Sequence, residues 1–377
     1  MKVFHILNLK GIGGVQSQFE VFYNNLSTKQ KSYNFILNIS GLDPEYSSLK
    51  SQVNRFLYKF LIYLVKNDII IHSYNNLISK KFYYLYSLIR PSNLIFHERG
   101  NAWNLDTSKK GFLVKNANLS KLIVCNSEST KIILNKKFGI NLKKLKVIYN
   151  GVISDQMILE ANKPNINESK DKFIIGYVGR LETNKGVHTL IKSMQYLDNQ
   201  KFQLNIIGDG SLREELEKYT RELGLKSVNF LGRITNAWSK IKNFDVIVVP
   251  SIREPLGNVI IEAALHKVPI IASRVDGIAE IIDDYQTGIL LTPSLPVNNR
   301  FVSKAVPLPE FVVDILDRKL KKPMELDSKE IMTAIKFIKK NKITALEFSD
   351  KLYTKVIDKF HIQKYTKELM QTYHELL

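Results

Sequence analysis

Two glutamates, Glu254 and Glu262, lie eight positions apart in the stretch "REPLGNVIIEAALHKVPIIAS", which follows the apolar run "DVIVVPS". Pro255 and Gly257 indicate a loop after a strand, with a helix beginning near residues 256–258. Glu262 would then lie roughly 7.5 Å along that helix. Two carboxylates at this stagger can accept hydrogen bonds from two polyol groups that flank a phosphate, each contributing about 1.5–3 kcal/mol. The alternative is that Glu254 complements a helix N-terminus and that Glu262 is structural.

Two cations follow another apolar run, "FIIGYVG". Arg180 and Lys185 lie five positions apart in "GRLETNKG", between a predicted strand and a predicted helix. Backbone amides and the positive end of a helix dipole, together with two cationic side chains, suit a diphosphate. The alternative is an ordinary loop that carries a lysine and an arginine.

The elements that must position these side chains alternate between strand and helix. In the first half, the predicted strands are "KVFHILNL", "YNFILNIS", "DIIIHSY", "NLIFHERG" and "KLIVCNS". In the second half they are "FIIGYVGRL", "FQLNIIGDG", "VNFLGRI", "DVIVVPS", "VPIIASRV" and "GILLTP". Such alternation predicts α/β architecture with parallel sheets, in which ligands bind outside the carboxyl ends of the strands.

The polar stretch 160–172 is the best candidate for a linker between two such units. We therefore predict an N-terminal domain over residues 1–165 and a C-terminal domain over 166–359. The lysine-rich tail from about residue 325 is predicted to be helical, and a last helix over about 360–377 is expected to pack back on the first domain.

The composition narrows the choice of function. The chain has 377 residues, one cysteine (Cys125) and a net charge of +19. Residues 1–165 hold 23 Lys and Arg against 9 Asp and Glu, a net +14, so the basic excess lies mainly in the first half. A basic field attracts phosphates of nucleic acids, anionic lipids or small molecules, but a solvated lysine surface explains it equally well. No apolar run is long enough to predict a membrane span, and the N-terminal stretch predicts a strand rather than a signal peptide.

The motifs "GRLETNKG", "IIGDGSLREEL", "FLGRI", "VVPSIREPLGNVIIEAA", "VPIIASRVDGIAEII" and "TGILL" occur in this order. Together they resemble the nucleotide-binding domain of the family-four retaining glycosyltransferases, strongly over about residues 170–295. The resemblance implies the GT-B fold, with two doubly wound Rossmann-like domains facing across a cleft. The first domain would lie on the acceptor side, and the second would bind a nucleotide-sugar.

The resemblance also implies roles for individual residues. Arg180 and Lys185 would bind the donor diphosphate, Glu254 the transferred sugar and Glu262 the ribose hydroxyls. Leu231 and Arg233, in the motif "FLGRI", are expected to lie near the nucleotide base. The backbone amides of Leu256, Gly257 and Asn258 are expected to contact the phosphates. Two local departures stand out: Leu256 lies where the family often has Phe or Tyr, and Asp276–Gly277 replaces a common Gly-Gly pair.

In the first half, Gly13 and Gly14 resemble the family's glycine-rich loop, where backbone amides can approach the donor phosphate. His97, at a predicted strand end, is expected to contact the donor sugar; a structural histidine is the alternative. Arg99 and Trp103 are candidate acceptor contacts, and residues 126–129 are expected to be mostly structural.

The chemistry that these groups suit is sugar transfer. Negative charge develops on the departing nucleotide diphosphate, so Arg180, Lys185 and helix dipoles are expected to stabilise it. No D-x-D motif suited to a metal is present, and the resemblance implies a metal-independent reaction with retention of anomeric configuration. His97 and Glu254 complete the expected catalytic set.

We therefore expect a glycosyltransferase without a cofactor, which uses a nucleotide-sugar, UDP-linked rather than GDP-linked. The expected acceptor is a glycan or a lipid-linked glycan of a bacterial surface polysaccharide. The expected location is cytoplasmic, with peripheral contact to an anionic membrane. The alternatives are a sugar-nucleotide epimerase, a nucleic-acid-binding protein and a catalytically silent protein of the same fold. Scattered lysines argue against nucleic acid as a partner.

Overall fold

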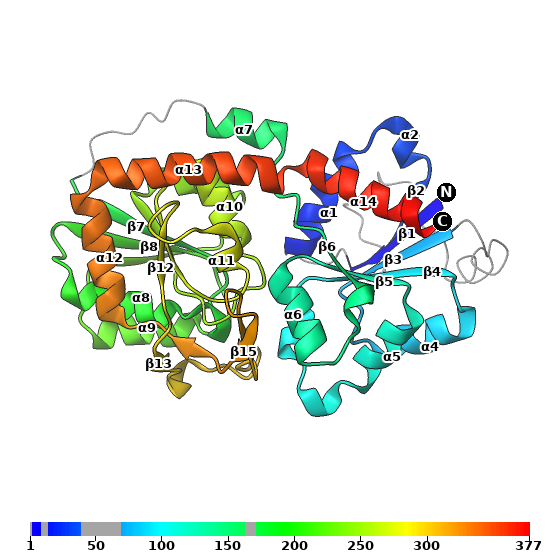
Figure 1. Ribbon diagram of the computed structural model, residues 1–377. Coiled ribbons are helices and arrows are strands. Elements are labelled where there is room, and N and C mark those ends of the chain that lie inside the picture. Colours follow the sequence, from blue (N-terminus) through cyan, green and yellow to red (C-terminus); the bar gives the residue numbers. More distant parts are fainter. Residues whose placement is uncertain (1, 9–13, 39–68, 163–170) are drawn as a thin grey trace. The chain divides into compact units, whose positions relative to one another are not determined.

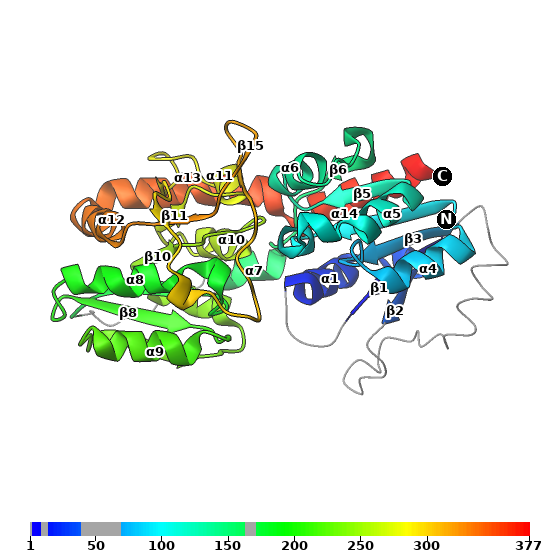
Figure 2. The ribbon, with the colours of Figure 1, turned by 90° about the horizontal axis from the view of Figure 1, so that it is seen from below.

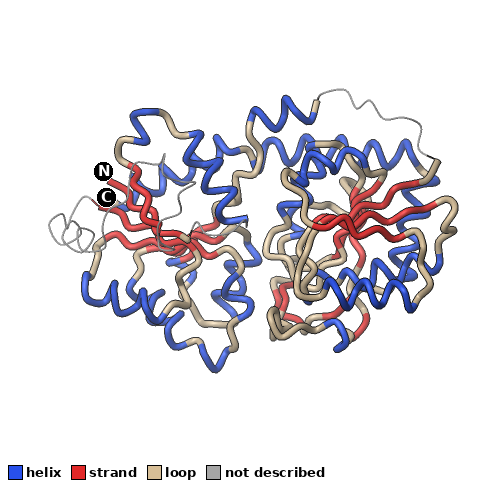
Figure 3. The backbone as a smooth tube through the Cα atoms, turned by 180° about the vertical axis from the view of Figure 1, so that it is seen from behind, coloured by secondary structure: helices blue, strands red, loops and turns tan. Residues whose placement is uncertain are grey.

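The computed structural model describes residues 2–8, 14–38, 69–162 and 171–377 (Figure 1). The chain forms two compact units. Unit 1 comprises Met1–Val152 and Phe360–Leu377, and unit 2 comprises Ile153–Lys359. Each unit contains a six-stranded parallel sheet with helices on both faces (Figure 3). The predicted α/β class with two doubly wound sheets is confirmed.

Unit 1 has the strand order β2-β1-β3-β4-β5-β6. Its strands are β1 (Lys2–Leu7), β2 (Asn34–Asn38), β3 (Ile69–Tyr74), β4 (Asn93–Glu98), β5 (Leu122–Cys125) and β6 (Leu145–Val147). Its helices are α1 (Gly14–Asn25), α2 (Thr28–Lys31), α4 (Lys80–Ile89), α5 (Gly111–Leu119), α6 (Glu128–Lys136) and α14 (Ile362–Leu376), with short 3-10 helices η2 (Asn101–Asn104), η3 (Thr107–Lys109) and η4 (Leu142–Lys144). Helices α1 and α14 cover one face of this sheet, and α4 and α5 cover the other (Figure 1). Strands β3 and β4 are therefore buried along their whole length, as central parallel strands are.

The C-terminal helix α14 belongs to unit 1. Its buried residues include Ile362, Tyr365, Leu369 and Tyr373, whose spacing of three and four positions places them on one helix face. These side chains join the core formed by α1 and the sheet. The Val152 N–H donates to the Phe360 carbonyl at 3.0 Å, which fixes the point where the chain returns to unit 1.

Unit 2 has the strand order β12-β11-β10-β7-β8-β9. Its sheet strands are β7 (Phe173–Val178), β8 (Phe202–Ile207), β9 (Val228–Gly232), β10 (Val246–Val249), β11 (Ile270–Ser273) and β12 (Ile289–Leu291). Its helices are α7 (Asp155–Ala161), α8 (Val187–Ser193), α9 (Arg213–Glu222), α10 (Asn258–Leu265), α11 (Ile278–Ile281), α12 (Ser328–Lys340) and α13 (Lys342–Phe360), with 3-10 helices η5 (Thr183–Lys185), η6 (Met194–Tyr196), η7 (Ala237–Asn243) and η8 (Asn299–Phe301). Seen from below, α8 and α9 lie along one face of this sheet, and α10, α11 and α13 lie beyond it (Figure 2). The strand order reverses between β7 and β10, and ligands of such sheets bind at the carboxyl ends beside this point.

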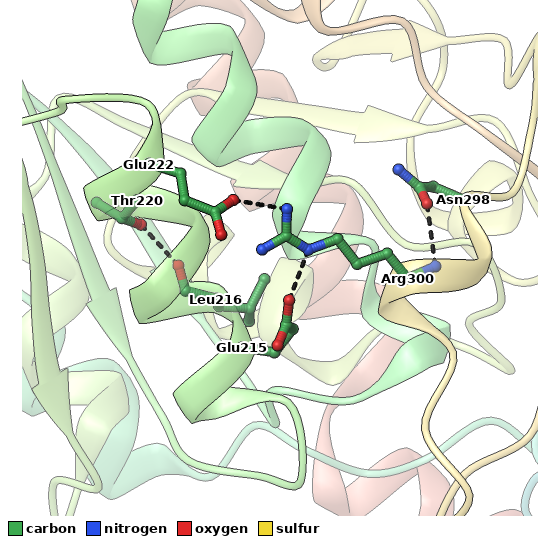
Figure 4. A network of polar contacts seen from close by, with 6 residues as sticks. All are labelled: Glu215, Leu216, Thr220, Glu222, Asn298 and Arg300. Atoms are coloured by element: carbon green, nitrogen blue, oxygen red, sulfur yellow. Dashed lines mark hydrogen bonds and ion pairs between the residues drawn. The ribbon is translucent and has the colours of Figure 1, made fainter.

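Four short strands follow β12: β13 (Leu295–Pro296), β14 (Val312–Asp314), β15 (Lys319–Lys321) and β16 (Met324–Glu325). Strands β14 and β15 form an antiparallel hairpin. Arg300 of η8 fastens this region to α9, because its guanidinium donates to Glu215 at 2.5 Å and to Glu222 at 2.6 Å (Figure 4). Glu215 and Glu222 are seven positions apart, so both carboxylates lie on the same side of α9.

Two parts of this architecture differ from the sequence expectations. The compact units divide after Val152 rather than after residue 165, because α7 packs against α10 of unit 2. Strand β6 and the four strands between β12 and α12 were not predicted. Residues 163–170 of the expected linker lie outside the described residues. Among the helices that are described, none is long and apolar enough to cross a membrane.

Candidate donor-binding site

Lys185 and Glu254 lie in two loops that are held together by backbone contacts. The Asn184 carbonyl accepts hydrogen bonds from the N–H groups of Ile252 at 3.0 Å and Arg253 at 3.1 Å. These bonds join the loop after β7 to the loop after β10, and the two strands are neighbours in the sheet. The Lys185 ammonium forms a hydrogen-bonded ion pair with the Glu254 carboxylate, and both side chains are largely buried. The structure thus brings together two of the residues predicted from the sequence.

Gly186 is the residue that permits this approach. It ends η5 and precedes α8 with φ +59°, a left-handed conformation that favours glycine. A Cβ atom added there would lie 2.3 Å from the Pro250 carbonyl oxygen. The loop that carries Lys185 therefore lies directly against the end of β10 only because residue 186 has no side chain.

The charges of Arg180 and Glu254 both affect the pKa of the buried Tyr177 hydroxyl. The Tyr177 hydroxyl donates to the Arg180 carbonyl at 2.8 Å. Burial raises the pKa of Tyr177 well above its usual value, the negative charge of Glu254 raises it further, and the positive charge of Arg180 opposes the shift. The Arg180 side chain is exposed. Arg180 thus lies exposed just after β7, in the same loop that carries Lys185.

Helix α10 begins at Asn258, where the sequence predicted a helix start. Gly257 precedes it with φ +103°, and, as a glycine, it has no side chain to cap the helix. Leu256 is only 2% exposed, so its side chain belongs to the interior of unit 2. The backbone of residues 256–258 forms the N-terminal turn to which we assigned phosphate contacts, and such a turn suits an anion.

Glu262 lies one turn further along α10. Burial raises the pKa of its carboxyl to about 7. Within the described part of the chain, this carboxylate has no hydrogen bond and no ion pair. Glu262 is half-buried. Because a carboxylate that is partly withdrawn from water and lacks partners is costly, its environment suits a ligand that donates hydrogen bonds, such as a pair of ribose hydroxyls.

Leu231 and Arg233 flank the end of edge strand β9, and both side chains are exposed. The Gly208 N–H donates to the Gly232 carbonyl at 2.8 Å, which holds this loop beside the end of β8. Their assignment to a nucleotide base stays a prediction.

His97 lies in unit 1, at the end of β4, and is fully buried. Its ring stacks on His72 at a centroid distance of 5.3 Å and on Tyr74 at 5.2 Å. Neither ring nitrogen has a hydrogen-bond partner among the residues that the structure describes. Burial, helped by the charge of Arg99, lowers the pKa of His97 well below its usual value, so the ring is neutral near pH 7.

The histidines that surround His97 were missed by sequence reasoning. His5 is hydrogen bonded to Tyr74 at 3.1 Å and to Asn34 at 2.8 Å, and His72 to Tyr373 at 2.6 Å. The available signal was a histidine inside each of three predicted strands, which are β1, β3 and β4 and lie side by side in the sheet. The result is a polar layer between the sheet of unit 1 and α14.

The remaining expectations in unit 1 have mixed outcomes. Gly14 begins α1, whereas Gly13 lies outside the described residues. Trp103 is fully buried, so the aromatic face that we assigned to an acceptor belongs to the core. Ser127 caps α6, with its hydroxyl accepting from the Thr130 N–H at 3.0 Å, which is the structural role expected for residues 126–129.

The described ranges contain no cluster of three or more His, Cys, Asp or Glu side chains suited to a metal ion. In unit 2, the loops after β7 and β10 and the helix α10 carry two cations, two carboxylates and a helix N-terminus. This combination can hold a diphosphate between two hydroxylated rings.

Known proteins resemble this chain in sequence and in structure. Residues 160–298 match the family model for glycosyl transferases group 1. An uncharacterized glycosyltransferase of Methanocaldococcus jannaschii is 33% identical over 185 residues, which are 46% of this chain and 47% of that protein. A capsular polysaccharide biosynthesis glycosyltransferase of Staphylococcus aureus is 31% identical over 149 residues, 38% of this chain and 39% of that protein. The chain thus matches less than half the length of these curated relatives.

Likeness of structure extends over the whole chain. HepE of Anabaena, solved in complex with UDP-glucose, superposes with a TM-score of 0.73 and 17% identity, and the match covers 100% of both chains. At this identity the likeness shows the fold. Residues 160–298 are thus similar to glycosyl transferases group 1, and the chain has the GT-B fold.

Proposed function

We propose that this chain is a retaining glycosyltransferase that moves a sugar from a UDP-sugar to a glycan or lipid-linked glycan of a bacterial surface polysaccharide. The Lys185–Glu254 ion pair at the ends of β7 and β10 carries the proposal, since it joins a diphosphate-binding cation to a sugar-binding carboxylate. The complex of HepE with UDP-glucose supports a UDP-sugar as donor. The capsule enzyme of S. aureus supports a surface polysaccharide as product.

The groups of unit 2 have distinct roles in this proposal. Arg180, Lys185 and the amides of residues 256–258 hold the diphosphate and stabilise the charge that develops when it departs. Glu254 accepts hydrogen bonds from the transferred sugar, and Glu262 accepts them from the ribose. Leu231 lies against the base.

The bond changes follow from retention of configuration. The bond between the anomeric carbon and the phosphate oxygen breaks, and the acceptor oxygen bonds to the same face of that carbon. The acceptor's proton passes to the departing phosphate, so neither a protein nucleophile nor a metal is needed. Trapping of a glycosyl–enzyme adduct would contradict this front-side route. Its chemistry also predicts that transfer persists within about 2-fold when EDTA is added, because Arg180 and Lys185 supply the positive charge; loss of transfer, restored by Mg²⁺, would contradict it.

The decisive experiment measures hydrolysis of UDP-sugars and GDP-sugars, and transfer from them, by the purified chain. Glu254→Gln and Lys185→Ala are expected to lower kcat/KM by about 100-fold, as loss of a charged group that stabilises the transition state does. Glu214→Gln on α9 and Lys192→Ala on α8, two exposed residues of the same unit, are the matched controls. Transfer that survives Glu254→Gln, or epimerised sugar nucleotide as the only product, would refute the proposal.

We propose that the chain acts in the cytoplasm, with a peripheral contact to the anionic face of the membrane through its basic first half. Flotation with liposomes tests this. Binding is expected for vesicles that contain phosphatidylglycerol and not for pure phosphatidylcholine, and it should weaken as salt is added. Equal binding to both vesicles would refute it.

A further inference from the structure

Asp276 is a fully buried carboxylate in the loop between β11 and α11 of unit 2. Its φ of +45° is left-handed, a conformation that costs most residues roughly 1–2 kcal/mol and that Asp tolerates better. It lies where the resemblance leads one to expect glycine. A carboxylate that is both buried and left-handed is costly, so contacts with the surrounding residues must stabilise it.

Both carboxylate oxygens of Asp276 accept hydrogen bonds from backbone amides. One oxygen accepts from the Glu254 N–H at 2.9 Å, and the other from the Val313 N–H at 2.6 Å. The Asp276 N–H in turn donates to the Val313 carbonyl at 3.0 Å, and the Gly277 N–H donates to the Glu254 carbonyl at 3.1 Å. The backbone of Glu254 is thus fixed from both its amide and its carbonyl.

Gly277 is needed for this arrangement. A Cβ atom there would lie 2.2 Å from the Pro255 carbonyl oxygen and 2.6 Å from the Leu256 Cα. The Asp276–Gly277 loop therefore packs in close contact with the backbone segment that links Glu254 to α10.

Opposing influences act on the ionisation of Asp276. Burial raises the pKa of Asp276 to about 7, while the two amide hydrogen bonds and the Arg253 guanidinium act in the opposite direction. The ionised carboxylate can accept both amide hydrogen bonds, one at each oxygen. Protonation would turn one oxygen into a donor, which could no longer pair with an N–H group in the same way.

We propose that Asp276 is a positioning residue, which ties the backbone of Glu254 to the β14–β15 hairpin and thereby aims the Glu254 carboxylate at the transferred sugar. The inference rests on the proposed function. Lys185 holds the Glu254 side chain, and Asp276 holds its backbone, so the two contacts together fix where the carboxylate lies. The hairpin lies beyond residues 160–298, which match the family model.

The test uses Asp276→Asn, which keeps the shape and tolerates the left-handed conformation but offers one acceptor, and Asp276→Gly, which removes both. The control is Asp284→Asn, because Asp284 also accepts a backbone hydrogen bond, from the Leu290 N–H at 2.9 Å, and its side-chain partner is Arg274 rather than a residue next to Glu254. We expect both Asp276 variants to lower kcat for sugar transfer about 10-fold or more, with the dissociation constant for UDP unchanged within about 2-fold. Asp284→Asn is expected to change neither.

A double-mutant cycle shows whether Asp276 acts through Glu254. In the Glu254→Gln background, Asp276→Asn should lower the residual rate by less than about 2-fold, because the group that it positions is already altered. Full additivity would overturn the proposal, as would unchanged kcat in folded Asp276 variants or a parallel loss of UDP affinity.

Hydrogen exchange tests the positioning separately from the reaction. In Asp276→Gly, the amides of Glu254 and Val313 should exchange faster than in the parent chain, while Asp284→Asn leaves them unchanged. If the parent chain transfers no sugar, the proposed function fails, and this exchange result still decides whether Asp276 holds the Glu254 backbone. Unchanged exchange at both amides would overturn that role.

Discussion

At the scale of single residues, the candidate site contains charges in two different states. Glu254 is neutralised by Lys185, whereas Glu262 has no cation beside it in the described structure. The first carboxylate is therefore held in place before a ligand arrives, and the second is free to accept hydrogen bonds. This difference makes Glu262 the group whose ionisation should govern nucleotide binding.

The pH dependence of UDP binding tests that role. The pKa of Glu262 is raised to about 7 by burial, so the carboxylate is present above pH 7 and is lost as the pH falls. If only the carboxylate accepts the ribose hydroxyls, affinity should fall about 10-fold between pH 8 and pH 6. Calorimetric titration of the parent chain and of Glu262→Gln measures this, and the variant corrects for titration of the UDP phosphates. A parent profile parallel to that of the variant would contradict the role.

The same raised pKa has a consequence for stability. A carboxyl that holds its proton more tightly in the folded state than in the unfolded state stabilises the fold at low pH, and this contribution is lost as the pH rises through about 7. Glu262→Gln should therefore be more stable than the parent chain at pH 8 and closer to it at pH 5. Urea denaturation at both values checks this expectation, and a stability difference that is larger at pH 5 would contradict it.

Residue types and spacing led us to propose Arg180, Lys185, Glu254 and Glu262, because charged groups after a predicted strand, or early in the helix that follows it, lie near the carboxyl edge of a sheet. They did not suffice for Asp276, whose role depends on two backbone amides, one of them 37 positions away. Nor did they reveal that Trp103 is buried, because an aromatic residue after a strand end suits a ligand and a core equally well.

At the scale of elements, the short distance between the loops after β7 and β10 depends on glycine. Gly186→Ala introduces a Cβ atom into the space of the Pro250 carbonyl. Gly224→Ala is the matched control, since Gly224 has a similar φ of +65° and no atom within 4 Å of the added Cβ. The control substitution should lower the free energy of unfolding by roughly 1–2 kcal/mol. Gly186→Ala should lower the free energy of unfolding by at least about 2 kcal/mol more, because the Pro250 carbonyl cannot move aside as a flexible side chain can. Equal midpoints in urea would contradict this account of the loop.

The sequence located most strands to within two or three residues, because buried parallel strands are continuous apolar runs of four to six residues. It did not reveal β6 or the four strands between β12 and α12, which are two or three residues long and show no period. Their pairing is set by tertiary contacts, such as that of Arg300 with α9 (Figure 4).

At the scale of the whole molecule, the chain leaves unit 1 at residue 152 and returns to it at residue 360. The hydrogen bond between His72 and Tyr373 joins the returning helix to the sheet of unit 1. The chain has two tryptophans, Trp103 in unit 1 and Trp238 in unit 2, so Trp238→Phe leaves a reporter for unit 1 alone.

In that background, Tyr373→Phe should lower the free energy of unfolding by about 1–3 kcal/mol, because buried His72 loses a partner. Tyr353→Phe on α13 of unit 2 is the control and should leave the Trp103 transition unchanged. Urea titration followed by tryptophan emission measures both. A Trp103 transition that does not respond to Tyr373→Phe would show that α14 contributes little to unit 1.

The central claim is that Arg180, Lys185, Glu254 and Glu262 together form a donor site. A crystal structure of the chain with a bound UDP-sugar tests it most directly. We predict the diphosphate on Arg180 and Lys185, a sugar hydroxyl within hydrogen-bonding distance of Glu254, and the ribose hydroxyls on Glu262. A nucleotide bound elsewhere, with these four side chains remote from it, would contradict the claim.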